Sequence, residues 1–155
     1  MSEPFNLYDA ALEASDGDPP GYGRRAASFG ALIGGERLGG TVYEVGPGDR
    51  LWPYHYEGVE EEWLLVLTGT PTLRDPGGEH VLAPGDLICF RPGPEGGHQV
   101  INRCGALARI VMFSTVPHPD LSISVYPDSD KVGVWPWPGK RLRTTDDIGY
   151  WDGEV

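Results

Sequence analysis

The sequence has few cysteines, few basic residues and no long apolar run. Two cysteines, Cys89 and Cys104, are too few for a disulfide framework in 155 residues, although they could form one bridge. No segment approaches the roughly 18 consecutive apolar residues of a membrane-spanning helix. The 12 Lys and Arg are scattered and outnumbered by 23 Asp and Glu, for a net charge of −11. This balance argues against a nucleic acid or an anionic membrane as the partner.

The N-terminal segment MSEPFNLYDA also lacks the basic and apolar regions of a secretory signal, so we expect a cytoplasmic protein. With nucleic acid and membrane disfavoured, the charge of the chain fits a cation or a small molecule as its ligand.

Glycine and proline are abundant, at 23 and 15 residues, and they separate short apolar runs at fairly even spacing. This pattern is typical of an all-β domain, an antiparallel sandwich or barrel. We predict an N-terminal arm over 1–24 with one or two helical turns, a barrel over 25–116, and an aromatic-rich C-terminal extension over 117–155 that packs on the barrel or on a partner. The predicted strands are 25–33, 38–45, 51–56, 62–67, 70–74, 79–82, 87–90, 98–102 and 106–114.

Acidic residues crowd the segment PYHYEGVEEEWLLVLTG, residues 53–69, immediately before its most apolar run. Either these charges lie in a solvated loop, or some of them surround a cation. Alternation along a strand places His55 and Glu57 on one face, and Glu62 shares a face with apolar residues that follow it. With His98 downstream, these side chains could hold a first-row divalent metal: His55, Glu57, Glu62 and His98.

The same residues resemble the two motifs of the cupin family. The first motif has the form Gly, five residues, His-x-His, three or four residues, Glu, six residues, Gly; its counterparts here are Gly48, six rather than five residues before His55, then His55, Glu57, Glu62 and Gly69. The second has the form Gly, Pro-x-Gly, His, three residues, Asn; its counterparts are Gly85, Pro94, Gly96, His98 and Asn102. The resemblance implies an antiparallel, jelly-roll-like cupin β-barrel with one divalent transition metal per chain.

The sequence departs from the family at Glu57, which stands where the second histidine is expected. Three interpretations follow. Glu57 could be a metal ligand, in a site that favours Fe, Mn or Zn over Cu. It could be a free catalytic base beside a metal held by His55, Glu62 and His98. Alternatively, the metal could be lost and the pocket could bind a ligand directly. We predict that Glu57 is a ligand.

Three functions from different classes are compatible with this site. Cupins of this size include sugar-phosphate isomerases, so the first is a small metalloenzyme acting on a small polar molecule, with Arg74 or Arg91 as candidates for holding a phosphate. The second is an iron dioxygenase that uses two histidines and a carboxylate. The third is a non-catalytic module that binds a small molecule or a metal.

Three further expectations concern residues outside the metal set. Glu60 and Glu61 are predicted to be solvated, and Cys89 is predicted to be a small core residue. The outward residues Trp63, Leu65 and Leu67 are too apolar to face water as one patch, so we expect a homodimer unless the C-terminal extension covers them.

Overall fold

Short alternating runs between turns fold into antiparallel β-strands, which confirms the predicted all-β class. The computed structural model describes residues 3–15, 17–115, 121–136 and 140–144. Within these ranges the strands are β1 (Glu13–Ala14), β2 (Arg24–Ser28), β3 (Leu38–Val45), β4 (Tyr56–Glu57), β5 (Glu62–Thr68), β6 (Thr72–Asp75), β7 (Gly78–Val81), β8 (Leu87–Phe90), β9 (Gln99–Ile101), β10 (Ala108–Thr115), β11 (Leu121–Tyr126), β12 (Lys131–Pro136) and β13 (Lys140–Arg143). Two 3₁₀ turns, η1 (Pro94–Gly96) and η2 (Pro127–Ser129), interrupt them.

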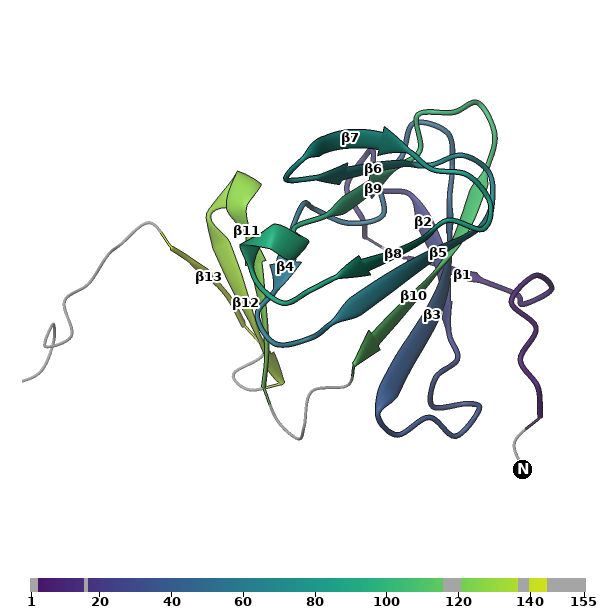
Figure 1. Cartoon of the computed structure of the whole chain (residues 1–155), viewed down its shortest axis with the longest axis horizontal. Coiled ribbons are helices and arrows are strands. Elements are labelled where there is room, and N and C mark those ends of the chain that lie inside the picture. The colour runs from purple at the N-terminus through teal and green to yellow at the C-terminus, as the bar shows by residue number, and fades with distance from the viewer. Residues whose placement is uncertain (1–2, 16, 116–120, 137–139, 145–155) are drawn as a thin grey trace, which may run out of the picture.

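The strands form three antiparallel sheets (Figure 1). A six-stranded sheet has the order β1-β2-β3-β10-β5-β8, and a three-stranded sheet has the order β7-β6-β9. The main apolar core joins these two sheets, since Val45, Leu64 and Ile110 of the first pack in one cluster with Leu73 and Val100 of the second. Burial of these side chains is the main stabilising contribution to the barrel.

The N-terminal segment covers part of the outer face of the six-stranded sheet. Phe5, Leu7 and Leu12 pack with Leu67 and other residues of this face in a second apolar cluster. Tyr8–Ala14, predicted to be helical, instead contains a turn and β1. The segment therefore buries Leu67, whereas Trp63 stays 39% exposed. The homodimer stays a prediction, which light scattering would test by a mass near twice 16.9 kDa.

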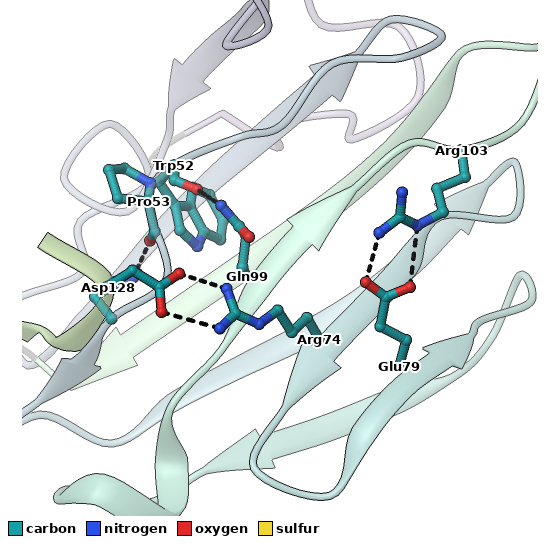
Figure 2. Close-up of polar contacts among 8 residues, drawn as sticks. Trp52, Pro53, Arg74, Glu79, Gln99, Arg103 and Asp128 are labelled. Carbon is teal, nitrogen blue, oxygen red and sulfur yellow. Dashed lines mark hydrogen bonds and ion pairs between the residues drawn. The ribbon is translucent and has the colours of Figure 1, made fainter.

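The C-terminal strands β11, β12 and β13 form a third sheet with β4, in the order β13-β12-β11-β4 (Figure 1). This sheet is attached to the barrel through β4, where Val125 pairs with Tyr56 and Ser124 pairs with Glu57. The turn η2 is also attached, because Arg74 of β6 donates two hydrogen bonds to the carboxylate of Asp128 (Figure 2). Trp137, Tyr150 and Trp151 of the aromatic-rich extension lie outside the described residues, as does His118.

Three predictions about local structure are wrong. The strand predicted over 25–33 ends at Ser28, because the chain turns there and the Phe29 N–H donates to the Gly40 carbonyl. The predicted strand over 51–56 is reduced to one isolated bridge at His55, ahead of β4. Cys89 is exposed on β8 and not in the core; it and Cys104 are free thiols, so the two form no bridge. In the described part of the chain, no helix has the length and apolarity to cross a membrane.

Candidate metal centre

Two histidines from distant parts of the chain meet at one end of the barrel. His55 precedes β4 and His98 precedes β9, and the two residues form an isolated antiparallel bridge. The His98 N–H donates to the His55 carbonyl at 2.8 Å, and the His55 N–H donates to the His98 carbonyl at 3.2 Å. The ring centroids lie 4.7 Å apart. Backbone hydrogen bonds thus fix the pair before any ligand binds.

Each imidazole is oriented by a hydrogen bond from its Nδ1 atom to a backbone carbonyl. The His55 Nδ1–H donates to Pro53 at 3.0 Å, and the His98 Nδ1–H donates to Gly96 at 2.9 Å. A carbonyl oxygen can only accept, so Nδ1 carries the proton in both neutral rings. The lone pair of Nε2 is therefore free in each ring, which is the arrangement that histidine metal ligands require.

Glu62, the first residue of β5, completes a compact group with the two histidines. One ligand atom from each of His55, Glu62 and His98 lies within 4.8 Å of the others. Glu62 Oε2 is 3.5 Å from His98 Nε2, and both atoms are buried without a hydrogen-bond partner. Buried polar atoms without partners are costly. Two imidazole nitrogens and a carboxylate oxygen form a donor set for a divalent transition metal, so these residues fit such an ion.

Burial opposes charge on every member of this group. Desolvation lowers the pKa of His98 to about 3, with the neighbouring His55 as a smaller cause, and it also lowers the pKa of His55. Desolvation, followed by the charges of Glu57 and Glu60, raises the pKa of Glu62 to about 8. Although His98 and Glu62 are close enough for an ion pair, neither is readily charged. A bound cation would stabilise the ionised Glu62 and needs neutral imidazoles.

Glu57 lies beside this group, on β4. Its Oε1 atom is 3.4 Å from His55 Nε2, but it is not one of the three residues of the compact group. The Ser124 hydroxyl lies 3.0 Å from Oε1 and 2.9 Å from Oε2 and donates to this carboxylate. Burial raises the pKa of Glu57 to about 7, against the lowering effect of the Ser124 hydrogen bond. Whether Glu57 is a ligand stays a prediction.

The burial of Glu60 differs from the prediction. It was predicted to be solvated, yet it is only 7% exposed, and its Oε2 atom has no hydrogen-bond partner. Its charge contributes to the raised pKa of both Glu57 and Glu62. Glu61 is outward as predicted, where it accepts a hydrogen bond from the Trp63 indole at 2.7 Å. Glu60 is therefore a third, buried carboxyl group that acts on the largely buried Glu57 and Glu62, which strengthens the case for a cation.

The other motif residues support the two histidines through the backbone. A Cβ atom on Gly96 would lie 1.9 Å from the Arg91 carbonyl oxygen, so only glycine fits where the chain turns to present its carbonyl to His98. Asn102 is fully buried, and its amide donates to the carbonyls of Val45 and Ala106. Asn102 therefore has a structural role, because its buried amide is hydrogen-bonded to the backbone, as buried polar groups generally are.

Aromatic rings hold the imidazoles on several sides. Phe90 stacks on His98 with ring centroids 3.9 Å apart, and Tyr126 stacks on His55 at 5.7 Å. Trp52 meets both imidazoles edge-on at 6.0 Å. Sequence reasoning missed Ser124 and Tyr126, although LSISVY, residues 121–126, alternates apolar and polar residues as a strand does.

A cavity of about 440 Å³ reaches the centre at His55. Its lining residues are Asp18, Pro19, Tyr22, Arg24, Leu51, Trp52, Pro53, His55, Tyr126, Lys131 and Arg141. A larger cavity of about 520 Å³ lies along the 14–25 segment and includes neither histidine nor Glu62. We assign the smaller cavity to the centre because His55 is in its wall. Arg74 and Arg91, the predicted phosphate ligands, do not line it.

The model of the cupin domain family matches residues 38–114. This range contains all three residues of the compact group, His55, Glu62 and His98. The chain belongs to the cupin superfamily. A search of curated proteins gives no match for this cupin.

Solved structures resemble this cupin over most of its length. One is a sugar phosphate isomerase of the cupin superfamily from Silicibacter pomeroyi DSS-3, with 25% identity, 96% of this chain and 98% of that chain covered, and a TM-score of 0.79. A second, from Acidithiobacillus ferrooxidans ATCC 23270, is provisionally named a sugar phosphate isomerase; it has 23% identity, 92% and 90% coverage, and a TM-score of 0.78. The polyketide cyclase RemF from Streptomyces resistomycificus has 22% identity, 77% and 82% coverage, and a TM-score of 0.61.

Proposed function

We propose that this cupin is a metal-dependent enzyme that acts on a small polar molecule, with sugar phosphate isomerisation as the reaction. The observation that carries the proposal is the pair of imidazole Nε2 atoms, each oriented through Nδ1, facing the buried carboxylate of Glu62. The similar structure from Silicibacter pomeroyi, which is named a sugar phosphate isomerase, supports the choice of reaction.

His55, Glu62 and His98 are the residues that would hold the metal. When bound, a divalent ion would supply Lewis-acid polarisation of a substrate carbonyl or hydroxyl. Glu57 is the candidate for proton transfer between adjacent carbons, because Ser124 fixes its carboxylate beside His55. The alternative role of Glu57, as a fourth metal ligand, remains our prediction. The two roles predict different metal contents for Glu57→Gln.

The cavity gives a substrate access to this group. Its volume of about 440 Å³ is within the usual range of small-molecule sites, about 300–1,000 Å³. His55 lies in its wall, whereas His98 is 1% exposed behind it. A substrate would therefore approach the centre from the His55 side, between Trp52 and Tyr126.

An iron dioxygenase is the second candidate. Two histidines and one carboxylate are the ligand set of non-haem iron enzymes, and the compact group has this composition. An assay of oxygen consumption by the iron-loaded protein, run beside the isomerase assay, distinguishes the two reactions. If neither activity is found in metal-loaded protein, the third expectation, a non-catalytic binding module, takes precedence.

The metal requirement is tested by changing one predicted ligand. His98→Ala removes an imidazole, so we expect bound metal to fall from about one ion per chain to less than a tenth of that, with isomerase activity lost in parallel. The measurement is elemental analysis after dialysis at pH 8, where both imidazoles, whose pKa values are lowered by burial, are neutral. His80→Ala is the matched control, because the His80 side chain is exposed and, among the described residues, hydrogen-bonded only to Asp75. Full occupancy in folded His98→Ala protein would refute the site.

A further inference from the structure

One wall of the cavity is built by Tyr126, Lys131 and Arg141 of the C-terminal sheet, outside the range matched by the cupin family. Lys131 begins β12 and Arg141 lies on β13. The register pairs Lys131 with Arg143 and Gly133 with Arg141, so Lys131 and Arg141 are diagonal neighbours on one face of the sheet. Diagonal neighbours lie roughly 7–8 Å apart, and somewhat less at their Cβ atoms, which is close enough for both side chains to reach one ligand group.

Four of the ten arginines in the described residues pair with acids, and Lys131 and Arg141 differ from these four. Arg74 pairs with Asp128, Arg103 with Glu79, and Arg109 with Glu44. Figure 2 shows the first two of these pairs. In contrast, among the described residues neither Lys131 nor Arg141 forms an ion pair; Lys131 lies over the Tyr126 ring at 5.2 Å, and Arg141 lies over the Trp135 ring at 4.8 Å.

A third cation lies in the same wall but is already engaged. The Arg24 guanidinium contacts Asp18 at 3.4 Å and donates to the Leu51 carbonyl at 2.9 Å. Asp18 is the one acid among the lining residues and is offset by this contact. The cavity therefore has a positive balance in a chain whose net charge is −11. A cavity of this charge selects an anion.

Tyr126 connects the cationic wall to the metal centre. The Tyr126 ring stacks on His55 with ring centroids 5.7 Å apart, and the Lys131 Nζ atom lies 5.2 Å from the centroid of the same Tyr126 ring. A molecule of a few carbons that lies along Tyr126 would thus present one end to His55 and the other to Lys131. The remaining wall is largely apolar or aromatic, with Trp52, Leu51 and Tyr22.

We infer that Lys131 and Arg141 bind the phosphate group of a sugar-sized phosphate monoester whose other end lies at His55. The inference rests on the proposed function for the end of the substrate that reacts at His55, but binding of the phosphate end can be tested without turnover. Arginine supplies planar paired donors and lysine a point charge, and both bind phosphate oxygens. The C-terminal sheet is accordingly the part of this cupin that recognises the substrate.

The test compares ribose 5-phosphate with ribose by isothermal titration calorimetry, on protein as purified and after chelation with EDTA. We expect the phosphate ester to bind at least tenfold more tightly than ribose, because charge-assisted hydrogen bonds strengthen binding. Lys131→Ala and Arg141→Ala should each weaken binding of the ester about tenfold and leave ribose binding unchanged. Arg141→Lys, which keeps the charge, should lose less. Inorganic phosphate should show the same dependence on both residues, more weakly.

The matched control is Arg37→Ala, which removes one exposed positive charge from the segment before β3. It should bind the ester as the wild type does. If Lys131→Ala lowers the melting temperature, Lys131→Gln, which keeps most of the side chain, replaces it. Equal binding of ester and ribose, or unchanged ester binding in both cavity variants, would overturn the inference. If the ester binds through its phosphate but the protein has no isomerase activity, the anion site is supported and the proposed reaction is rejected. If both variants are active and bind the ester as the wild type does, only the anion site is rejected.

Discussion

The barrel and the C-terminal sheet contribute to one site in different ways. The barrel supplies His55 and His98, which are joined by two backbone hydrogen bonds, and Glu62, which begins β5. The C-terminal sheet supplies Ser124, Tyr126, Lys131 and Arg141, which act through side chains on an attached sheet. We therefore expect metal binding to depend on the barrel backbone, and substrate selection to depend on side chains that can change without disturbing that backbone.

The largest effect is expected where the barrel backbone is tightest. Gly96→Ala would place a Cβ atom 1.9 Å from the Arg91 carbonyl oxygen, and backbone cannot move aside cheaply. We expect a loss of about 3 kcal/mol in the free energy of unfolding, at the upper end of the usual cost of overpacking. Urea denaturation measures it.

The control for this change is Gly105→Ala, where an added Cβ would meet no atom within 4 Å. Its stability should stay within about 0.5 kcal/mol of the wild type. Because Gly96 also presents its carbonyl to His98, the Gly96 variant should bind metal more weakly than the Gly105 variant. Equal stability of the two variants would show that the barrel tolerates change at its site as readily as at an open loop.

An intermediate effect is expected at Glu57, where the two regions meet. If Glu57 is a ligand, Glu57→Gln should lower metal content, because a neutral amide attracts a cation less strongly, and Glu57→His should keep it. If Glu57 is a free base, Glu57→Gln should keep the metal and abolish turnover. Elemental analysis of the two variants separates the roles. We predict the first pattern; retention of one ion per chain in Glu57→Gln would contradict it.

Sequence reasoning located the barrel half of the site and missed the other half, for physical reasons. The ligand positions sit in motifs that the backbone geometry demands, such as Gly96 next to Arg91 and the buried Asn102 amide. Lys131 and Arg141 belong to no such motif, and only strand register brings them together. Glu60 was misjudged because a run of three glutamates gives no sign of which one turns inward.

The smallest effect is expected from the ion pair that joins the two regions. Arg74 and Asp128 are partly exposed, so Arg74→Ala should lower stability by at most about 1 kcal/mol. Arg103→Ala is the matched control, because its pair with Glu79 is similarly exposed but lies within the barrel (Figure 2). The two variants should therefore unfold alike and hold the same amount of metal. Only Arg74→Ala should weaken binding of ribose 5-phosphate, by a few-fold, because η2 connects the strands that carry Tyr126 and Lys131. If both variants bind the ester equally well, the position of the C-terminal sheet does not depend on this pair, and its attachment through β4 is sufficient.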